Sequence, residues 1–187
     1  MVGGRNTRKA GRTALAGLAL AIAAAWTPTP AAAESQAVEQ TVELDAPVEL
    51  VWRVLTDFAA WPRFVPNLKH IDVLGDAQQP TALRYSTESI GIVIGFTART
   101  EVHADLHRLD LALDESAPSD IAAMRASWQL TPLGGDRVRI QFRSAIETGQ
   151  PVPEFIQRRV MRASVEETIR NFTSEVERAK GTATSGA

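Results

Sequence analysis

Residues Ala46–Leu74 read APVELVWRVLTDFAAWPRFVPNLKHIDVL and decide how the fold begins. Pro47 suits a first helical turn, and Glu49 within that turn interacts favourably with the helix dipole. Apolar residues then recur at helical spacing, which predicts a short amphipathic helix over residues 47–56. Two further prolines interrupt the next segment, so residues 58–65 are predicted to form at most one or two irregular turns.

Strand signals lie on both sides of this stretch. Before it, apolar and polar residues alternate from Gln36 to Leu44, which is typical of a half-buried strand. After it, apolar runs of strand length recur between turn signals rich in glycine, aspartate and serine. Short strands at near-regular spacing predict an antiparallel meander. The runs are 68–74, 83–88, 92–102, 109–113, 124–130 and 138–146.

The last two runs indicate which side of the sheet is buried. Met124–Leu130 and Val138–Ile146 place apolar side chains at alternate positions, with basic or polar side chains between them. One face of the sheet is therefore expected to be apolar and the other basic and wet, as in antiparallel sheets covered on one side. Gly134 and Gly135 between the two runs predict a hairpin.

A long helix is predicted at the end of the chain. Neither glycine nor a further proline occurs between Pro153 and Lys180, so one helix of about 27 residues and about 40 Å fits there. Gly181 is expected to end it and to leave residues 181–187 as a disordered tail. The predicted apolar stripe consists of Val165, Ile169, Phe172 and Val176, continued upstream by Phe155, Ile156, Val160 and Met161.

The first 33 residues have the order of an export signal. Four basic residues precede Thr13–Trp26, which carries no charge, and a small-residue site comes next at Ala31–Ala33. We expect cleavage after Ala33, a mature domain over residues 34–180, and a periplasmic or secreted location. An uncleaved anchor is the alternative, although a membrane span needs about 20 apolar residues.

Composition excludes several classes of function. The sequence has no cysteine, so disulfides, thiolate metal sites and a cysteine nucleophile are absent. Four of the 20 basic residues and none of the 22 acidic residues lie in residues 1–33, so the rest carries 16 basic against 22 acidic residues. An acidic domain gains no counterion-release energy from phosphate, so we expect no nucleic-acid partner.

The predicted order is a strand, two short helices, six strands and a long terminal helix. This order resembles the START-like (SRPBCC, Bet v 1-like) superfamily, in its polyketide cyclase/dehydrase and coenzyme-Q-binding branch. Ala46–Leu74 carries the family's opening pattern, and Trp128, the Gly134-Gly135 hairpin and the EETIRNF run at Glu166–Phe172 support it. The resemblance implies an α+β helix-grip fold. Its parts are a seven-stranded curved antiparallel sheet, two short N-terminal helices and a long C-terminal helix over a cavity.

A strongly curved sheet cannot lie flush against one straight helix, so side chains or a ligand must fill the space between them. Pockets of this kind are mostly apolar. The alternative is that the same residues simply interdigitate as a core. Trp61 and Phe64 lie near the mouth that the resemblance implies, and the other candidates are expected to face inward. The predicted ligand-binding residues are Trp61, Phe64, Tyr85, Phe96, Met124, Trp128, Phe142, Phe155, Met161 and Phe172.

No catalytic constellation is visible, so we predict no catalytic residue, no metal and no cofactor. His103 and His107 have a spacing that suits a metal on a helix, but they flank a predicted turn. Glu88, Asp110 and Arg125 would enter the cavity only if the assignment of faces were wrong by one residue; a carboxylate there could act as an acid or a base. Nucleophile-elbow, phosphate-loop and dinucleotide patterns are also missing.

The sequence leaves three hypotheses for function. The first is an exported monomer that binds or transports a hydrophobic small molecule such as a quinone, isoprenoid, fatty acyl or polyketide-like compound. The second is an enzyme of the cyclase or dehydratase type acting on such a compound in the same cavity. The third is an interaction protein with a vestigial pocket. A transient contact with a membrane surface is compatible with the first.

Overall fold

A computed structural model describes residues 37–89, 91–149 and 153–185. The export signal predicted over residues 1–33 lies outside the described residues. The elements in chain order are β1 (Val38–Leu44), α2 (Val48–Thr56), the 3-10 helix η1 (Phe58–Arg63), β2 (Leu68–Gly75), β3 (Pro80–Ser89), β4 (Ile92–His103), the 3-10 helix η2 (Ala104–Leu106), β5 (Arg108–Leu113), β6 (Ala123–Gly134), β7 (Arg137–Glu147) and α3 (Glu154–Ser185).

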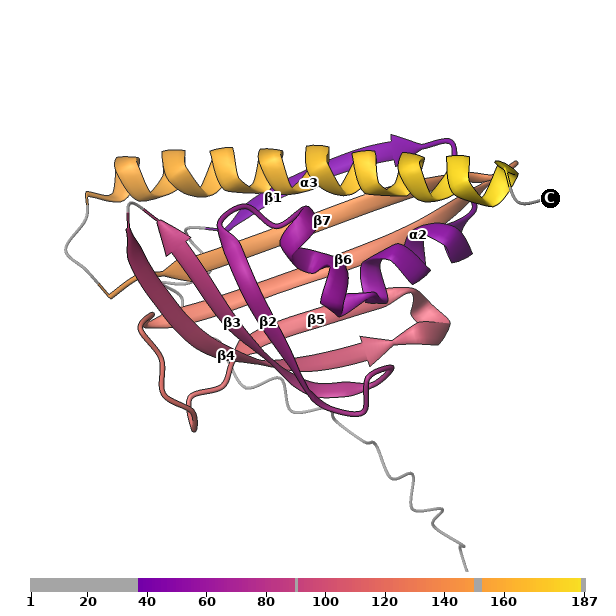
Figure 1. Ribbon diagram of the computed structural model, residues 1–187. Helices are drawn as coiled ribbons and strands as arrows, with labels where there is room; N and C mark the ends of the chain where they lie inside the picture. Colours follow the sequence, from indigo (N-terminus) through magenta and orange to yellow (C-terminus); the bar gives the residue numbers. More distant parts are fainter. Residues whose placement is uncertain (1–36, 90, 150–152, 186–187) are drawn as a thin grey trace, which may run out of the picture.

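The strands form one antiparallel sheet in the order β1-β7-β6-β5-β4-β3-β2. Consecutive strands from β2 to β7 are neighbours, and β1 closes the order by pairing with β7, with Val42 opposite Ile140. Strands β2 to β4 cross β5 to β7 steeply, so the sheet is strongly bent (Figure 1). This confirms the predicted helix-grip architecture.

Local sequence explains the tight connections. Gly135 and Asp136 both have positive φ angles, 59° and 55°, between β6 and β7. This backbone conformation at both central residues matches the right-handed twist of the paired strands. The predicted hairpin is therefore confirmed. His107 also has a positive φ and comes directly after η2, where the chain turns from β4 into β5.

Helix α3 runs along the sheet on the side where α2 and η1 also lie (Figure 1). Its middle turns, from Val165 to Val176, carry the buried face: Phe172 and Val176 are fully buried, and Val165 and Ile169 nearly so. The hydrophobic core therefore lies between the concave face of the sheet and these middle turns of the helix. Among the helices that the structure describes, none is long and apolar enough to cross a bilayer.

Two predictions about α3 are wrong. The helix continues through Gly181 to Ser185, because a glycine near a helix end costs only about 1 kcal/mol and Thr182 Oγ1 bonds the Arg178 carbonyl. The predicted disordered tail is therefore helical up to residue 185. The apolar stripe also does not continue upstream as expected, because Phe155 and Val160 are 73% and 61% exposed. At about 100° per residue, Val160 points about 120° away from Phe172.

Candidate functional site

The concave face of the sheet is apolar on every strand. Strand pairing sets Trp128 opposite Leu109 and Phe142, and Tyr85 opposite Ile71 and Phe96. Alternation along each strand then fixes the other inward positions. Those inward residues include Val42, Leu83, Ala98, Leu111, Met124, Ala126, Leu130, Val138 and Ile140. The face predicted from the sequence is therefore correct.

Seven of the predicted aromatic residues contact one another in one continuous chain of rings. Trp128 stacks on Phe142 with ring centroids 4.0 Å apart, and Phe172 of α3 lies 5.1 Å from Trp128. Phe64 lies 5.2 Å from Phe172 and 5.9 Å from Trp61. The chain continues from Trp61 to Tyr85 at 6.3 Å, and from Tyr85 to Phe96 at 4.7 Å.

The 3-10 helix η1 holds the middle of this chain. The Trp61 indole Nε1 donates to the Leu55 carbonyl at 2.8 Å, which fixes the ring against α2. Asn171 Nδ2 donates to the Phe64 carbonyl at 3.3 Å and ties α3 to the same segment. Trp61 and Phe64 are 3% and 1% exposed, so they lie inside the molecule and not at an open mouth.

The remaining predicted residues separate into three environments. Met124 is buried beside the aromatic chain, on the inward face of β6. Met161 is half-buried on α3. Phe155 is exposed, so its predicted inward orientation is wrong; it lies in the first turn of α3, before the helix meets the core. A ligand-binding role for all ten stays a prediction.

Three pockets formed by the described residues lie at the surface, and none of the seven rings lines them. One of about 590 Å³ is bounded by the start of β1 and by Arg158, Arg162 and Glu166 of α3. Another of about 370 Å³ lies among Glu154, Phe155 and the arginines of the first turns of α3. In this structure the aromatic rings therefore pack as a core, and the predicted interior cavity stays a prediction.

Three polar atoms are nevertheless buried without a hydrogen-bond partner among the described residues: Gln40 Oε1, Tyr85 Oη and Thr100 Oγ1. Strand register places all three residues on the concave face, opposite Phe142, Phe96 and Leu111 respectively. Burial raises the pKa of the Tyr85 phenol far above its ordinary value, so this group stays neutral. Sequence reasoning singled out Tyr85 but missed Gln40 and Thr100, although both occupy inward positions of the alternation.

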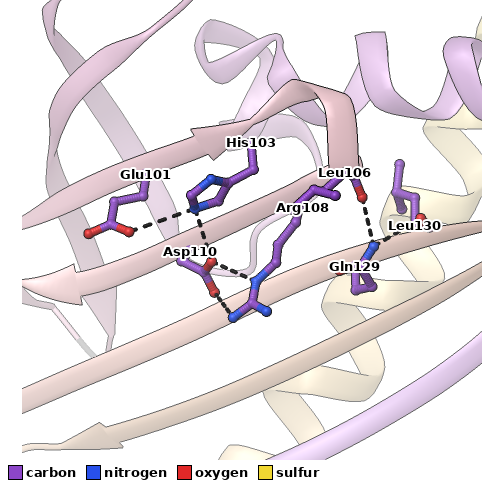
Figure 2. Close-up of polar contacts among 7 residues, drawn as sticks. All are labelled: Glu101, His103, Leu106, Arg108, Asp110, Gln129 and Leu130. Atoms are coloured by element: carbon purple, nitrogen blue, oxygen red, sulfur yellow. Dashed lines mark hydrogen bonds and ion pairs between the residues drawn. The ribbon is translucent and has the colours of Figure 1, made fainter. Parts of the chain in front are cut away.

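The charged candidates lie on the outer face. Asp110 accepts two hydrogen bonds from Arg108, at 2.7 and 2.9 Å, and lies 3.7 Å from His103 Nε2 (Figure 2). Glu101 lies 3.7 Å from the same nitrogen. Glu88 pairs with Lys69 at the surface, and Arg125 is exposed. The assignment of faces is therefore not shifted by one residue.

The charged and polar side chains on the outer face lie in solvent and connect neighbouring elements. Gln129 Nε2 donates to the carbonyls of Leu106 and Leu130, which ties β6 to the β4–β5 turn (Figure 2). His107 bonds Glu49 at 3.2 Å and contacts the Trp52 ring edge-on. Within residues 37–89, 91–149 and 153–185, no three histidine, aspartate or glutamate side chains gather closely enough to hold a metal ion.

The bent seven-stranded sheet, the long terminal helix and the apolar face between them define a helix-grip protein of the START-like superfamily. The chain belongs to the family described as polyketide cyclase / dehydrase and lipid transport, whose model matches residues 44–173. That match covers strands β2 to β7, the short helices between them and β1, and α3 up to residue 173.

Individual relatives agree with this assignment. The chain is 28% identical over 104 residues to the granaticin polyketide synthase bifunctional cyclase/dehydratase of Streptomyces virginiae, which covers 56% of this chain and 34% of that protein. The chain thus matches about a third of the length of this relative.

Two solved structures share the fold. A START superfamily protein from Mycobacterium smegmatis superposes with a TM-score of 0.67 at 23% identity, covering 76% of this chain and 97% of that one. The Zhui aromatase/cyclase from a Streptomyces species superposes with a TM-score of 0.61 at 22% identity, covering 76% and 93%.

Proposed function

We propose that this protein binds and carries a hydrophobic small molecule between the concave face of its sheet and α3. The family description includes lipid transport, and the described concave face is built from apolar side chains on all seven strands. Burial of apolar ligand surface contributes about 25 cal/mol per Å², so a long acyl, isoprenoid or polycyclic ligand gains most of its affinity there.

The observation that carries this proposal is the set of unpartnered polar atoms on the apolar face. A buried donor or acceptor left without a partner costs about 1–3 kcal/mol, and such groups are rare in folded proteins. A ligand oxygen reaching Tyr85 Oη or Thr100 Oγ1 would remove that cost. The pattern therefore favours an apolar molecule with a few oxygen atoms, such as a quinone, a fatty acyl compound or a polyketide-like compound.

Tyr85 also supports a second candidate, a cyclase or dehydratase activity on such a ligand. The names of the relatives point to that chemistry for those proteins. Tyr85 is the one ionisable side chain on the concave face that the structure describes, and its raised pKa keeps it a proton donor and not a base. General acid–base catalysis needs an accepting group as well. The binding function therefore has the stronger support.

Native mass spectrometry of the protein purified from its natural compartment tests the binding function. We expect a mass excess that solvent extraction removes and that lipid mass spectrometry identifies as an apolar compound with few oxygen atoms. The matched control is Arg139→Gln, on the outer face of β7, which should retain the compound. Repeated recovery of bare protein under gentle conditions would favour an interaction protein with a filled core.

We also propose that the chain is exported. The support is the order of basic residues, apolar run and small-residue site in residues 1–33. The mass of the protein recovered from the cell envelope or the medium should correspond to a chain beginning at Glu34. Recovery of the full-length chain from the cytoplasm would contradict export and would leave the binding proposal untouched.

A further inference from the structure

Large apolar side chains are exposed at one end of the molecule. Isolated exposed apolar residues are ordinary, whereas a group of them marks an interaction site. Both the start of β4 and the start of α3 lie at the left-hand end in Figure 1. The group, here named the docking tip, consists of Ile92 (61% exposed), Val93 (63%), Phe155 (73%), Ile156 (41%) and Val160 (61%).

The helical part of the docking tip points away from the core. At about 100° per residue, Ile156 and Val160 lie about 160° and 120° from Phe172, which is fully buried. These side chains therefore do not continue the core stripe of α3, and they form a second apolar face on its first turns. In the part of the chain that the structure describes, no other element covers this face.

Arginines lie along one side of that apolar face: at about 100° per residue, Arg159 points about 60° and Arg162 about 120° away from Ile156. Arg158 pairs with Glu154, while the guanidinium groups of Arg159 and Arg162 form no hydrogen bond or ion pair within the described residues. Glu154, Phe155 and these three arginines enclose the surface hollow of about 370 Å³. Free guanidinium groups bind phosphate oxygens well. This basic region belongs to a chain with a net charge of −2, so the attraction for anions is local.

We propose that the docking tip, with Arg159 and Arg162, binds the surface of an anionic lipid bilayer. A short helical face of aromatic and branched apolar residues flanked by arginines is the pattern of interfacial membrane binding. The β4 tip adds a second point of insertion, since Ile92 and Val93 come directly after Gly91, around which the structure shows open space. This proposal does not rest on ligand binding, so the two can fail separately.

Site-specific fluorescence tests the proposal, because the sequence has no cysteine of its own. Val160→Cys carries an environment-sensitive nitrobenzoxadiazole label on the docking tip. Leu106→Cys is the matched control, since Leu106 is 58% exposed but lies in η2, at the far end of β4. Vesicles of phosphatidylcholine, alone or mixed with phosphatidylglycerol, are added to each labelled full-length protein.

We expect the label at position 160 to move into an apolar environment with vesicles containing phosphatidylglycerol, and the label at position 106 to stay in water. Adding Arg159→Gln and Arg162→Gln should weaken the partition about thirtyfold, because each basic side chain near an anionic leaflet contributes about 1 kcal/mol. The same double change at Arg99 and Arg125, on the outer face of the sheet, should have little effect.

Three results would overturn the proposal. The first is an unchanged signal at position 160, and the second is an equal response at position 106. The third is a response at position 160 that rises with protein concentration without vesicles, which would assign the face to a second copy of this chain. Circular dichroism of each labelled protein confirms that it is folded.

Discussion

Tyr85 is the single tyrosine of the sequence, and its ring stacks on Phe96 inside the molecule. Burial raises the pKa of its phenol in the folded state, whereas in the unfolded chain this pKa is about 10. A group whose pKa is higher in the folded state contributes stability below the unfolded value, and this stability is lost as the pH rises above it.

Alkaline titration should therefore show a coupled event. Below about pH 10 the tyrosine contribution to the free energy of unfolding should be constant, and above it the protein should lose stability. Tyrosinate absorbance and the loss of the folded circular dichroism signal are expected to rise together. Tyrosinate formation near pH 10 in a protein that remains folded would contradict the buried position of Tyr85.

Replacing Tyr85 by phenylalanine separates packing from hydrogen bonding. The ring is retained, and a hydroxyl without a partner is removed, so ligand-free protein should be as stable as the original or up to about 1 kcal/mol more stable. Affinity for an oxygen-bearing ligand such as decylubiquinone should fall about five- to tenfold, because one net hydrogen bond is lost. Urea denaturation and a fluorescence titration measure the two effects.

Helix α3 has a buried phenylalanine and an exposed one, and replacing each by alanine compares the two environments. Phe172→Ala should cost about 3–5 kcal/mol, because this ring is fully buried between Phe64 and Trp128. Phe155→Ala, 17 positions earlier in the same helix, should cost less than about 0.5 kcal/mol. Denaturant unfolding compares them, and similar losses would contradict the assignment of faces.

Strand β7 offers a test at two neighbouring positions. Ile140 is fully buried between β1 and β6, so Ile140→Asp places an unpaired charge in the core and should cost more than about 4 kcal/mol. Arg139→Gln removes an exposed ion pair with Glu43 and should change stability by less than about 1 kcal/mol. Thermal unfolding distinguishes them, and equal effects would mean that the strand faces the other way.

Sequence alone predicted most elements because their signals are local. Alternation of apolar and polar residues depends only on the pleat, so β1, β6 and β7 were predicted with their correct faces. The helix through Gly181 was missed because a single glycine is a weak stop signal. Phe155 and Val160 were assigned to the core because they are apolar, although helical geometry already placed Val160 away from Phe172.

The site was predicted less completely than the fold. The inward rings could be deduced from strand parity, and seven of them form the observed chain of contacts. It could not be deduced that Gln40 and Thr100 lack hydrogen-bond partners. Whether a buried polar atom finds a partner depends on neighbours that are far apart in the sequence. The docking tip likewise depends on which face of α3 meets the sheet.

On the scale of the whole molecule, α3 closes the core with its middle turns, from Val165 to Val176, and its first turns extend beyond the core. The bent sheet and this helix enclose an apolar interior in which the rings meet one another. For a ligand to enter, those rings must separate, and the unpartnered Tyr85 hydroxyl gives the interior a polar contact for it. The account therefore predicts that an apolar ligand binds inside and not on the surface of α3.

Intermolecular nuclear Overhauser effects between unlabelled oleic acid and isotope-labelled protein test this central claim most directly. We predict contacts from the acyl chain to Tyr85, Met124 and Trp128 on the concave face. Contacts confined to Phe155, Arg158 and Arg162 on the surface of α3, with no change at Trp128, would contradict it.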